Sequence, residues 1–197
     1  MHFARNRCLL ACAAAVLAFS RANAVTPGFD LHGTAQVAGR SIANAVVWLE
    51  APSVAGEPAS GRVVLDQRNL SFSPQVLAVR VGTTVDFPNS DRVFHNVFSF
   101  RDGKRFDLGM YPVGARRRVT FDKPGLSRIF CNIHPNMAAY VVAVDSPYFA
   151  VSDSSGQFSI ASVVPRSYMY HAWRAGASEL SGTWSPADGP TLTVDWR

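Results

Sequence analysis

An all-β fold is predicted by three features of this 197-residue chain. Short apolar or alternating runs of strand length recur along it, and turn residues separate them. β-Branched and aromatic residues are frequent in these runs, as is usual in strands. No apolar pattern of helical period extends over several turns. Short strands at this spacing are typical of a Greek-key sandwich or barrel.

The first strands lie near the N-terminus. Residues 33–37 alternate between apolar and polar, and the turn Ala38-Gly39-Arg40 follows them. Residues 45–49 form a continuous apolar run, which is typical of a buried strand. Residues 52–61 are rich in Pro, Gly, Ser and Ala, so we expect a linker or a long loop there.

The middle and the end of the chain continue the strand pattern. Residues 101–113 break it and are expected to be a long irregular excursion, and residues 149–160 are a hairpin candidate with Asp, Ser and Gly at the tip. The other predicted strands are residues 62–66, 76–81, 83–87, 93–100, 117–121, 127–131, 138–144, 167–173 and 191–194.

The first 24 residues are typical of a cleavable signal peptide. Basic residues precede an apolar stretch over residues 9–19, and Ala22-Asn23-Ala24 fits the small-x-small cleavage rule. The stretch is shorter than the roughly 20 residues of a membrane span. We therefore expect a periplasmic protein that begins near Val25 and has no stable membrane insertion. A lipoprotein anchored through Cys12 is the weaker alternative, because few apolar residues precede that cysteine.

Cleavage would lower the formal net charge from +5 to +2, because three arginines lie in the predicted signal. The remaining charge gives no reason to expect nucleic-acid binding. A basic cluster is left, which is either a solvated face or a surface that steers an acidic redox partner. Its members are Arg101, Lys104, Arg105 and Arg116-Arg117-Arg118.

Cys131 is the one cysteine that would remain after cleavage, so it has no partner for an internal disulfide. Cys131, His134 and Met137 lie within seven residues, and His95 is a second imidazole 36 residues upstream of the cysteine. Two imidazoles and a thiolate with a weak axial thioether form a blue-copper electron-transfer site. Structural zinc normally takes four strong ligands, and a thioether is a poor fourth. Met110 is the alternative axial donor.

Residues 85–144 resemble the cupredoxins, the blue-copper family of plastocyanin, amicyanin and azurin. Residues 89–97 are similar to the first-ligand segment of that family, N-x(5)-H-N-V, and Cys131-x-x-His134-x-x-Met137 is similar to its short, amicyanin-type ligand loop. The resemblance implies one mononuclear type 1 copper site. Its equatorial ligands would be His95, Cys131 and His134, its axial ligand Met137, and Asn96 would hydrogen-bond across to the cysteine loop.

The resemblance also implies a periplasmic carrier of single electrons that meets redox protein partners transiently. His134 would reach the surface through an apolar patch, with Phe94, Pro135 and Asn136 at its rim. The protein itself would fill every copper position, so we expect no enzyme activity. The other histidines that would remain after cleavage, His32 and His171, cannot supply a multicopper centre. A copper-binding or delivery protein without redox turnover and a metal-free interaction module remain as alternatives.

The two flanks resemble one further module. Residues 33–49 are similar to the opening of carboxypeptidase-regulatory-like or transthyretin-like β-sandwich domains, and residues 151–173 to their later part, although Arg166 stands where glycine is usual. The resemblance implies a split second sandwich, residues 25–57 and 147–197, around a cupredoxin domain of residues 58–146. Bacterial proteins of this overall pattern are often labelled methylamine utilization proteins, which implies an electron-acceptor role.

Overall fold

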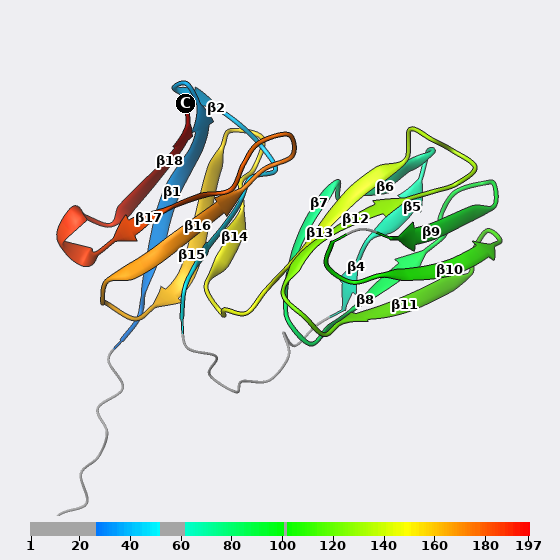
Figure 1. Ribbon diagram of the computed structural model, residues 1–197, viewed down its shortest axis with the longest axis horizontal. Helices are drawn as coiled ribbons and strands as arrows, with labels where there is room; N and C mark the ends of the chain where they lie inside the picture. Colours follow the sequence, from blue (N-terminus) through cyan, green and yellow to red (C-terminus); the bar gives the residue numbers. More distant parts are fainter. Residues whose placement is uncertain (1–26, 52–61, 101) are drawn as a thin grey trace, which may run out of the picture.

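The computed structural model describes residues 27–51, 62–100 and 102–197. Over these ranges the chain is all-β apart from one short 3-10 helix, and the strands form two β-sandwiches (Figure 1). This confirms the predicted fold class. The predicted signal peptide, the predicted linker and Arg101 lie outside the described residues. Within the described ranges, no helix has the length and apolar character that crossing a bilayer would require.

The central sandwich contains strands β4 to β13. One layer is the five-stranded sheet β10-β9-β12-β13-β7, the other is the three-stranded sheet β11-β8-β4, and β5 pairs with β6. The bounds are β4 (Val63–Val64), β5 (Asp66–Arg68), β6 (Ser71–Ser73), β7 (Val76–Arg80), β8 (Thr83–Pro88), β9 (His95–Ser99), β10 (Phe106–Tyr111), β11 (Arg116–Phe121), β12 (Gly125–Phe130) and β13 (Ala138–Val144).

The core of the central sandwich is apolar and includes two of the predicted metal ligands. Large side chains such as Phe87, Tyr111 and Phe121 fill it, and Cys131 and Met137 belong to the same buried cluster. Successive side chains of a strand point to opposite faces of the sheet, so every second residue of these strands points into the core. The predicted ligand loop is therefore attached directly to the packed interior.

The terminal sandwich draws its strands from both flanks of the chain. One sheet has the order β15-β1-β18, with β2 paired to β1, and the other has the order β14-β3-β16-β17. The N-terminal and C-terminal segments thus share both sheets and one core. The bounds are β1 (Phe29–Val37), β2 (Arg40–Ser41), β3 (Val46–Leu49), β14 (Phe149–Val151), β15 (Gln157–Val163), β16 (Tyr168–Trp173), β17 (Leu180–Trp184), η1 (Pro186–Asp188) and β18 (Thr191–Trp196).

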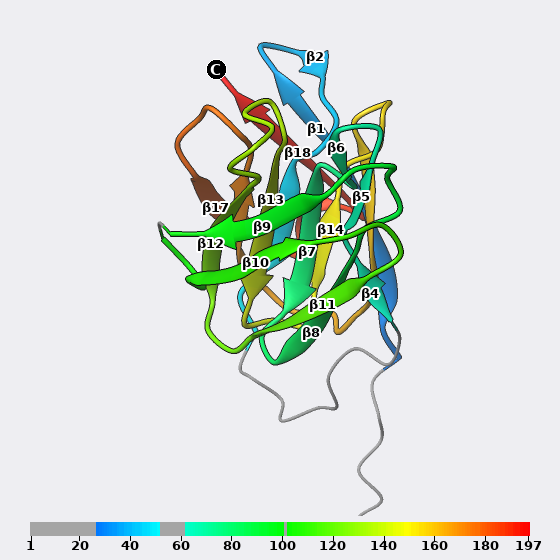
Figure 2. The same ribbon diagram turned by 90° about the vertical axis from the view of Figure 1, so that its right-hand side faces the viewer.

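A third apolar cluster joins the two sandwiches. Val46 of β3 packs in it with Val142 and Val144 of β13, and Trp173 packs on Tyr140 with ring centroids 5.1 Å apart. Successive residues of β3 thus serve different clusters, since its next residue, Val47, belongs to the terminal core. Figure 2, which looks from the side of the central sandwich, shows its strands in front of the terminal sandwich.

The predicted irregular excursion over residues 101–113 is wrong in its second half. Residues 106–111 form β10, which pairs with β9. The register shifts between Asp107 and Met110, and Gly109 there has a φ of +64°. This irregularity interrupts the regular alternation that would have identified a strand from the sequence.

The predicted hairpin over residues 149–160 is also wrong, because its two strands lie in different sheets. β14 pairs with β3, whereas β15 pairs with β1. The turn itself exists, since the Asp153 carboxylate accepts hydrogen bonds from the backbone N–H groups of Ser155 and Gln157. Ser152 is buried, accepts from the Ala45 N–H and donates to the Ile42 carbonyl, which holds the chain between the sheets.

Candidate metal centre

Three of the predicted ligands converge at one end of the central sandwich. His95 is the first residue of β9, Cys131 directly follows β12, and His134 lies in the loop before β13. The Nδ1 atoms of His95 and His134 are 3.0 Å apart. The Sγ atom of Cys131 lies 3.9 Å from Nδ1 of His95 and 3.6 Å from Nδ1 of His134. Among the described residues, this is the one group of three that could hold a metal ion.

The three donor atoms fit a copper ion. Nitrogen and sulfur donors that bind one ion at about 2.0–2.3 Å cannot lie more than about 4.5 Å apart, and all three separations meet that condition. A thiolate is a soft ligand and imidazole suits copper, so the donor chemistry agrees with the spacing. The predicted ligand residues can therefore act on a single ion.

The donors differ in their access to solvent. His95 and Cys131 are 0% and 4% exposed, whereas His134 is only half-buried. Exposed apolar side chains flank the two histidines along the chain, namely Phe94 beside His95 and Ile133 beside His134. His134 is therefore the donor nearest to a surface that another protein could approach.

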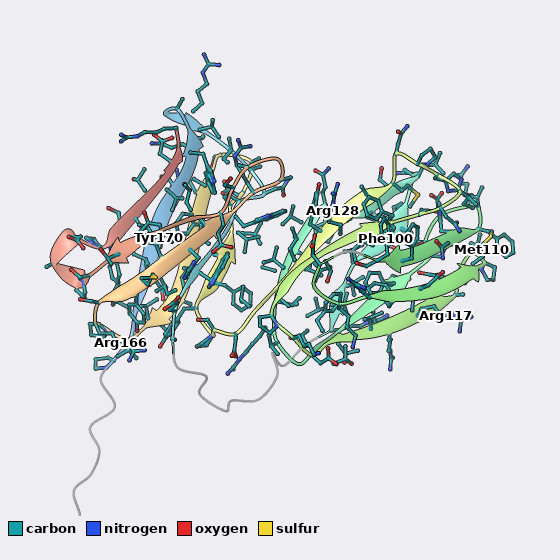
Figure 3. All side chains as sticks on the ribbon, in the orientation of Figure 1. Phe100, Met110, Arg117, Arg128, Arg166 and Tyr170 are labelled. Atoms are coloured by element: carbon teal, nitrogen blue, oxygen red, sulfur yellow. The ribbon has the colours of Figure 1, made fainter. Side chains whose placement is uncertain are left out.

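Met137 and Met110, the two candidate axial donors, differ in burial and in their link to the ligand loop. Its backbone N–H donates to the His134 carbonyl at 2.9 Å, and its own carbonyl accepts from the Cys131 N–H at 3.4 Å, so the ligand loop closes on itself. The side chain of Met137 is buried in the same cluster as Cys131. Met110 is 53% exposed on β10, and Figure 3 shows it at the edge of the central sandwich farthest from the terminal one.

Asp91 holds the ring of His95 from the opposite side. Its Oδ2 lies 3.0 Å from Nε2 of His95. The backbone N–H of Leu70, followed by that of Arg92 and the His95 ring, lowers the pKa of Asp91 to about 2. The carboxylate can only accept, so Nε2 of His95 carries the proton and Nδ1 presents its lone pair to the metal position. No role was predicted for Asp91, although its place four residues before His95 was a signal.

Asn89 braces the segment that leads into His95. Its side-chain amide donates to the carbonyls of Val93 and Tyr111, at 2.9 and 3.2 Å, and its Oδ1 accepts from the Asp91 N–H. Asn89 is buried, and its polar side-chain atoms would destabilise the fold if they had no hydrogen-bond partners there, so these bonds also offset the cost of burying them. The sequence pattern included Asn89 but did not reveal this function.

Asn96 has a different partner from the one expected. Its amide donates to Oδ1 of Asp107 at 2.8 Å, on the neighbouring strand β10, and not to the cysteine loop. Within the described part of the chain, its own Oδ1 is buried without a hydrogen-bond partner. Asn96 follows His95 on β9, and successive side chains of a strand point to opposite faces, which directs it away from the metal position.

The predicted basic cluster is partly neutralised within the fold. Arg118 and Arg116 pair with Asp86 at 2.8 and 3.5 Å, and Arg62 pairs with the same carboxylate at 2.6 Å. Burial opposes the charge of Asp86, but the hydrogen bonds and positive charges of Arg62 and Arg118 outweigh it and hold the pKa below its usual value. Two members of the predicted cluster, Arg116 and Arg118, are therefore paired within the fold.

Comparison with known proteins gave matches among solved structures alone. No protein-family model and no curated protein matches the chain. It is similar to a purple cupredoxin from Nitrosopumilus maritimus, with 28% identity over 42% of this chain and 99% of that one and a TM-score of 0.39. A reduced amicyanin mutant has 29% identity over 51% and 99%, with a TM-score of 0.40. A copper-containing nitrite reductase from Thermus scotoductus SA-01 has 28% identity over 48% and 27%, with a TM-score of 0.41.

Proposed function

We propose that the protein is a blue-copper electron carrier of the cupredoxin kind. His95, Cys131 and His134 would bind one copper ion, and Met137 would be the axial donor. The observation that carries this proposal is the convergence of two Nδ1 atoms and one Sγ atom within 3.9 Å of one another. A bound copper ion would supply a one-electron Cu(II)/Cu(I) couple.

The chain holds these donors in place through its strands and hydrogen bonds. Cys131 continues β12, His95 begins β9, and β12 lies next to β9 in the sheet. Asp91 orients the ring of His95, and the bond from Met137 to His134 closes the loop. Ligands fixed by packing and by outer hydrogen bonds move little when an electron arrives or leaves, and a carrier needs this property.

Burial of the donors favours a carrier over a delivery protein or an enzyme. His95, Cys131 and Met137 are each at most 4% exposed, so an ion held by them could not pass easily to an acceptor site. Four protein donors also leave little room for a substrate on the ion. Delivery of copper without redox turnover is therefore the weaker alternative.

We propose that a redox partner docks on the exposed apolar side chains beside the two histidines. Val93, Phe94 and Ile133 are 41%, 52% and 43% exposed. Transient redox encounters use small interfaces, and His134 is the donor closest to this surface. Export to the periplasm is part of the proposal and rests on the signal-like pattern of residues 1–24.

Visible and electron-spin-resonance spectra of the copper-loaded protein test the proposal. The wild type should show an intense blue band and a reversible potential, and Cys131→Ser should lose that band while its circular dichroism stays unchanged. His32→Asn is the matched control, because it removes an exposed histidine of the terminal sandwich, and it should remain blue. A colourless wild type, or a Cys131→Ser variant that is equally blue, would contradict the proposal. Bound copper without a reversible potential would favour the delivery alternative.

A further inference from the structure

A hollow of about 640 Å³ lies between the two sandwiches, away from the candidate copper centre. Its central-sandwich wall includes Gly125, the first residue of β12, whereas Cys131 follows the last residue of that strand. Six residues of strand separate the two positions by about 20 Å. None of the proposed copper ligands lines the hollow.

The terminal-sandwich wall of the hollow is aromatic and held in place. The ring of Trp48 stacks on that of His171, with centroids 5.2 Å apart and an interplanar angle of 13°. Trp173 also lines the hollow and is packed against Tyr140 of the central sandwich. Leu126 and Val142 provide an apolar wall on the opposite side. Two indole rings are thus positioned at the junction of the sandwiches.

The polar groups of the hollow are mostly acidic. Glu50 and Glu179 each place a carboxylate oxygen 2.8 Å from one ring nitrogen of His171, and Asp145 also lines the hollow. A protonated His171 would neutralise only one of these three carboxylates. None of the described residues that line the hollow is lysine or arginine. The hollow therefore keeps an excess of negative charge.

We propose that this hollow binds a small organic ammonium ion. Indole faces attract cations, the carboxylates supply the opposite charge, and the volume lies in the range of small-molecule sites, about 300–1,000 Å³. A bare metal ion fits less well, because Glu50 and Glu179 approach opposite nitrogens of His171 and their oxygens do not converge. This site is independent of the copper proposal.

Calorimetric titration of the full chain with choline tests the charge requirement. The neutral isostere 3,3-dimethylbutan-1-ol has the same shape without the positive charge. Choline should bind saturably. The affinity of the isostere should be lower by a factor of about ten or more, because cation–π and carboxylate contacts need the positive charge. No saturable binding of choline, or equal affinity for both compounds, would overturn the proposal.

Variants and nuclear magnetic resonance locate the binding. Glu50→Gln combined with Glu179→Gln keeps hydrogen-bond acceptors beside His171 and should weaken choline binding about tenfold. Asp122→Asn is the control, since it removes an exposed carboxylate of the central sandwich that pairs with Lys104, and it should leave the affinity unchanged.

In the wild-type protein, choline should shift the indole N–H signals of Trp48 and Trp173 and leave those of the buried Trp184 and Trp196 in place. This measurement does not depend on how well the double variant folds. Shifts confined to Trp184 and Trp196, or unchanged affinity in a folded double variant, would show that the hollow is not the site.

Discussion

The two sandwiches differ in what they bury. Within the described residues, the central sandwich buries eight polar side chains, whereas the terminal sandwich buries Ser152, and Ser146 is buried where the chain passes between them and donates to the Leu49 carbonyl. The central set is Gln67, Thr83, Asp86, Asn89, His95, Asn96, Ser99 and Ser127. Both apolar cores contain large aromatic side chains, such as Phe87 and Phe121 in the central sandwich and Trp184 and Trp196 in the terminal one, so the difference lies in the buried polar groups.

This difference shows where the chain tolerates costly groups. A buried polar atom without a partner costs about 1–3 kcal/mol, so such groups are retained where they serve a purpose. In the central sandwich, Asn89 and His95 are buried at the candidate copper centre with hydrogen-bond partners. Among the described residues, both sandwiches also leave some buried polar atoms without a partner, such as Oδ1 of Asn96 and Nε1 of Trp184. The terminal sandwich keeps its polar cluster of Glu50, His171 and Glu179 at the hollow. Substitutions in one sandwich should therefore leave the properties of the other largely intact.

The largest expected effect comes from deleting residues 147–197. β3 would lose both of its neighbours, β14 and β16, and β1 would lose β15 and β18. Unpaired apolar strands recruit other chains, so the shortened protein should aggregate in size-exclusion chromatography. A fragment of residues 62–146 keeps all ten central strands and should still turn blue with Cu(II). A monomeric deletion variant with cooperative unfolding would refute the shared terminal core.

Core truncations test whether the two sandwiches are independent. Leu31→Ala in the terminal core and Leu65→Ala in the central core each remove a side chain that is 0% exposed, so each should cost about 2–5 kcal/mol. In calorimetry of the copper-loaded protein, each substitution should lower the temperature at which its own sandwich unfolds. Leu31→Ala should leave the blue band unchanged. Equal shifts of both transitions in either variant would show that the sandwiches unfold as one unit.

Removing the charge of Asp91 should weaken copper binding without unfolding the sandwich. Asp91→Asn leaves a weaker, neutral acceptor for Nε2 of His95, and loss of such outer partners typically lowers metal affinity about 10–100-fold. Competition with a copper chelator measures the change. Asp122→Asn alters an exposed carboxylate that pairs with Lys104 and lies before the start of β12, at the other end of that strand from Cys131, and it should retain wild-type affinity. If Asp91→Asn bound copper as tightly as the wild type, the charge of Asp91 would not be needed to orient the ring of His95.

Acid should weaken the central sandwich through Asp86. Its pKa in the folded protein is lowered, so the stability that it contributes is present above the unfolded pKa of about 3.9 and is lost as the pH falls below about 4. Asp86→Asn removes this contribution, and unfolding of the variant should depend less on pH between about 4 and 2. Urea denaturation of copper-free protein at several pH values measures it. If the stability of the wild type and that of Asp86→Asn depended on pH in the same way, the ion pairs of Asp86 with Arg62, Arg116 and Arg118 would not have the predicted role.

The smallest change is expected at the axial ligand. Met137→Leu should keep the ion but raise the reduction potential, because loss of a weak axial donor disfavours Cu(II). Met110→Leu is the matched control and should leave the potential unchanged, since Met110 is exposed. If the reduction potential changed in Met110→Leu and not in Met137→Leu, Met110 and not Met137 would be the axial donor.

Local patterns predicted most strands and the all-β class, but they missed β17, and they failed where a strand was irregular or where successive strands join different sheets. The bulge at Gly109 hid β10, and the turn at Asp153 looked like a hairpin although its strands join different sheets. The donor types were also predictable, because Cys131 and His134 are neighbours in the sequence. The hydrogen bonds of Asp91 with Leu70 and of Asn89 with Tyr111 were not, since these partners come from another loop and another strand.

By itself, the sequence determined the alternation that makes each strand and the thiolate, imidazole and thioether that the ligand loop offers. These are properties of short segments, which burial and local geometry decide. The tertiary structure alone decided that Nδ1 of His95 meets the Sγ atom of Cys131, 36 positions away, and that Glu50 meets His171 across 121 positions. It also turned Asn96 towards Asp107. Such contacts depend on which sheets pair and on how layers pack, and no local pattern encodes that choice.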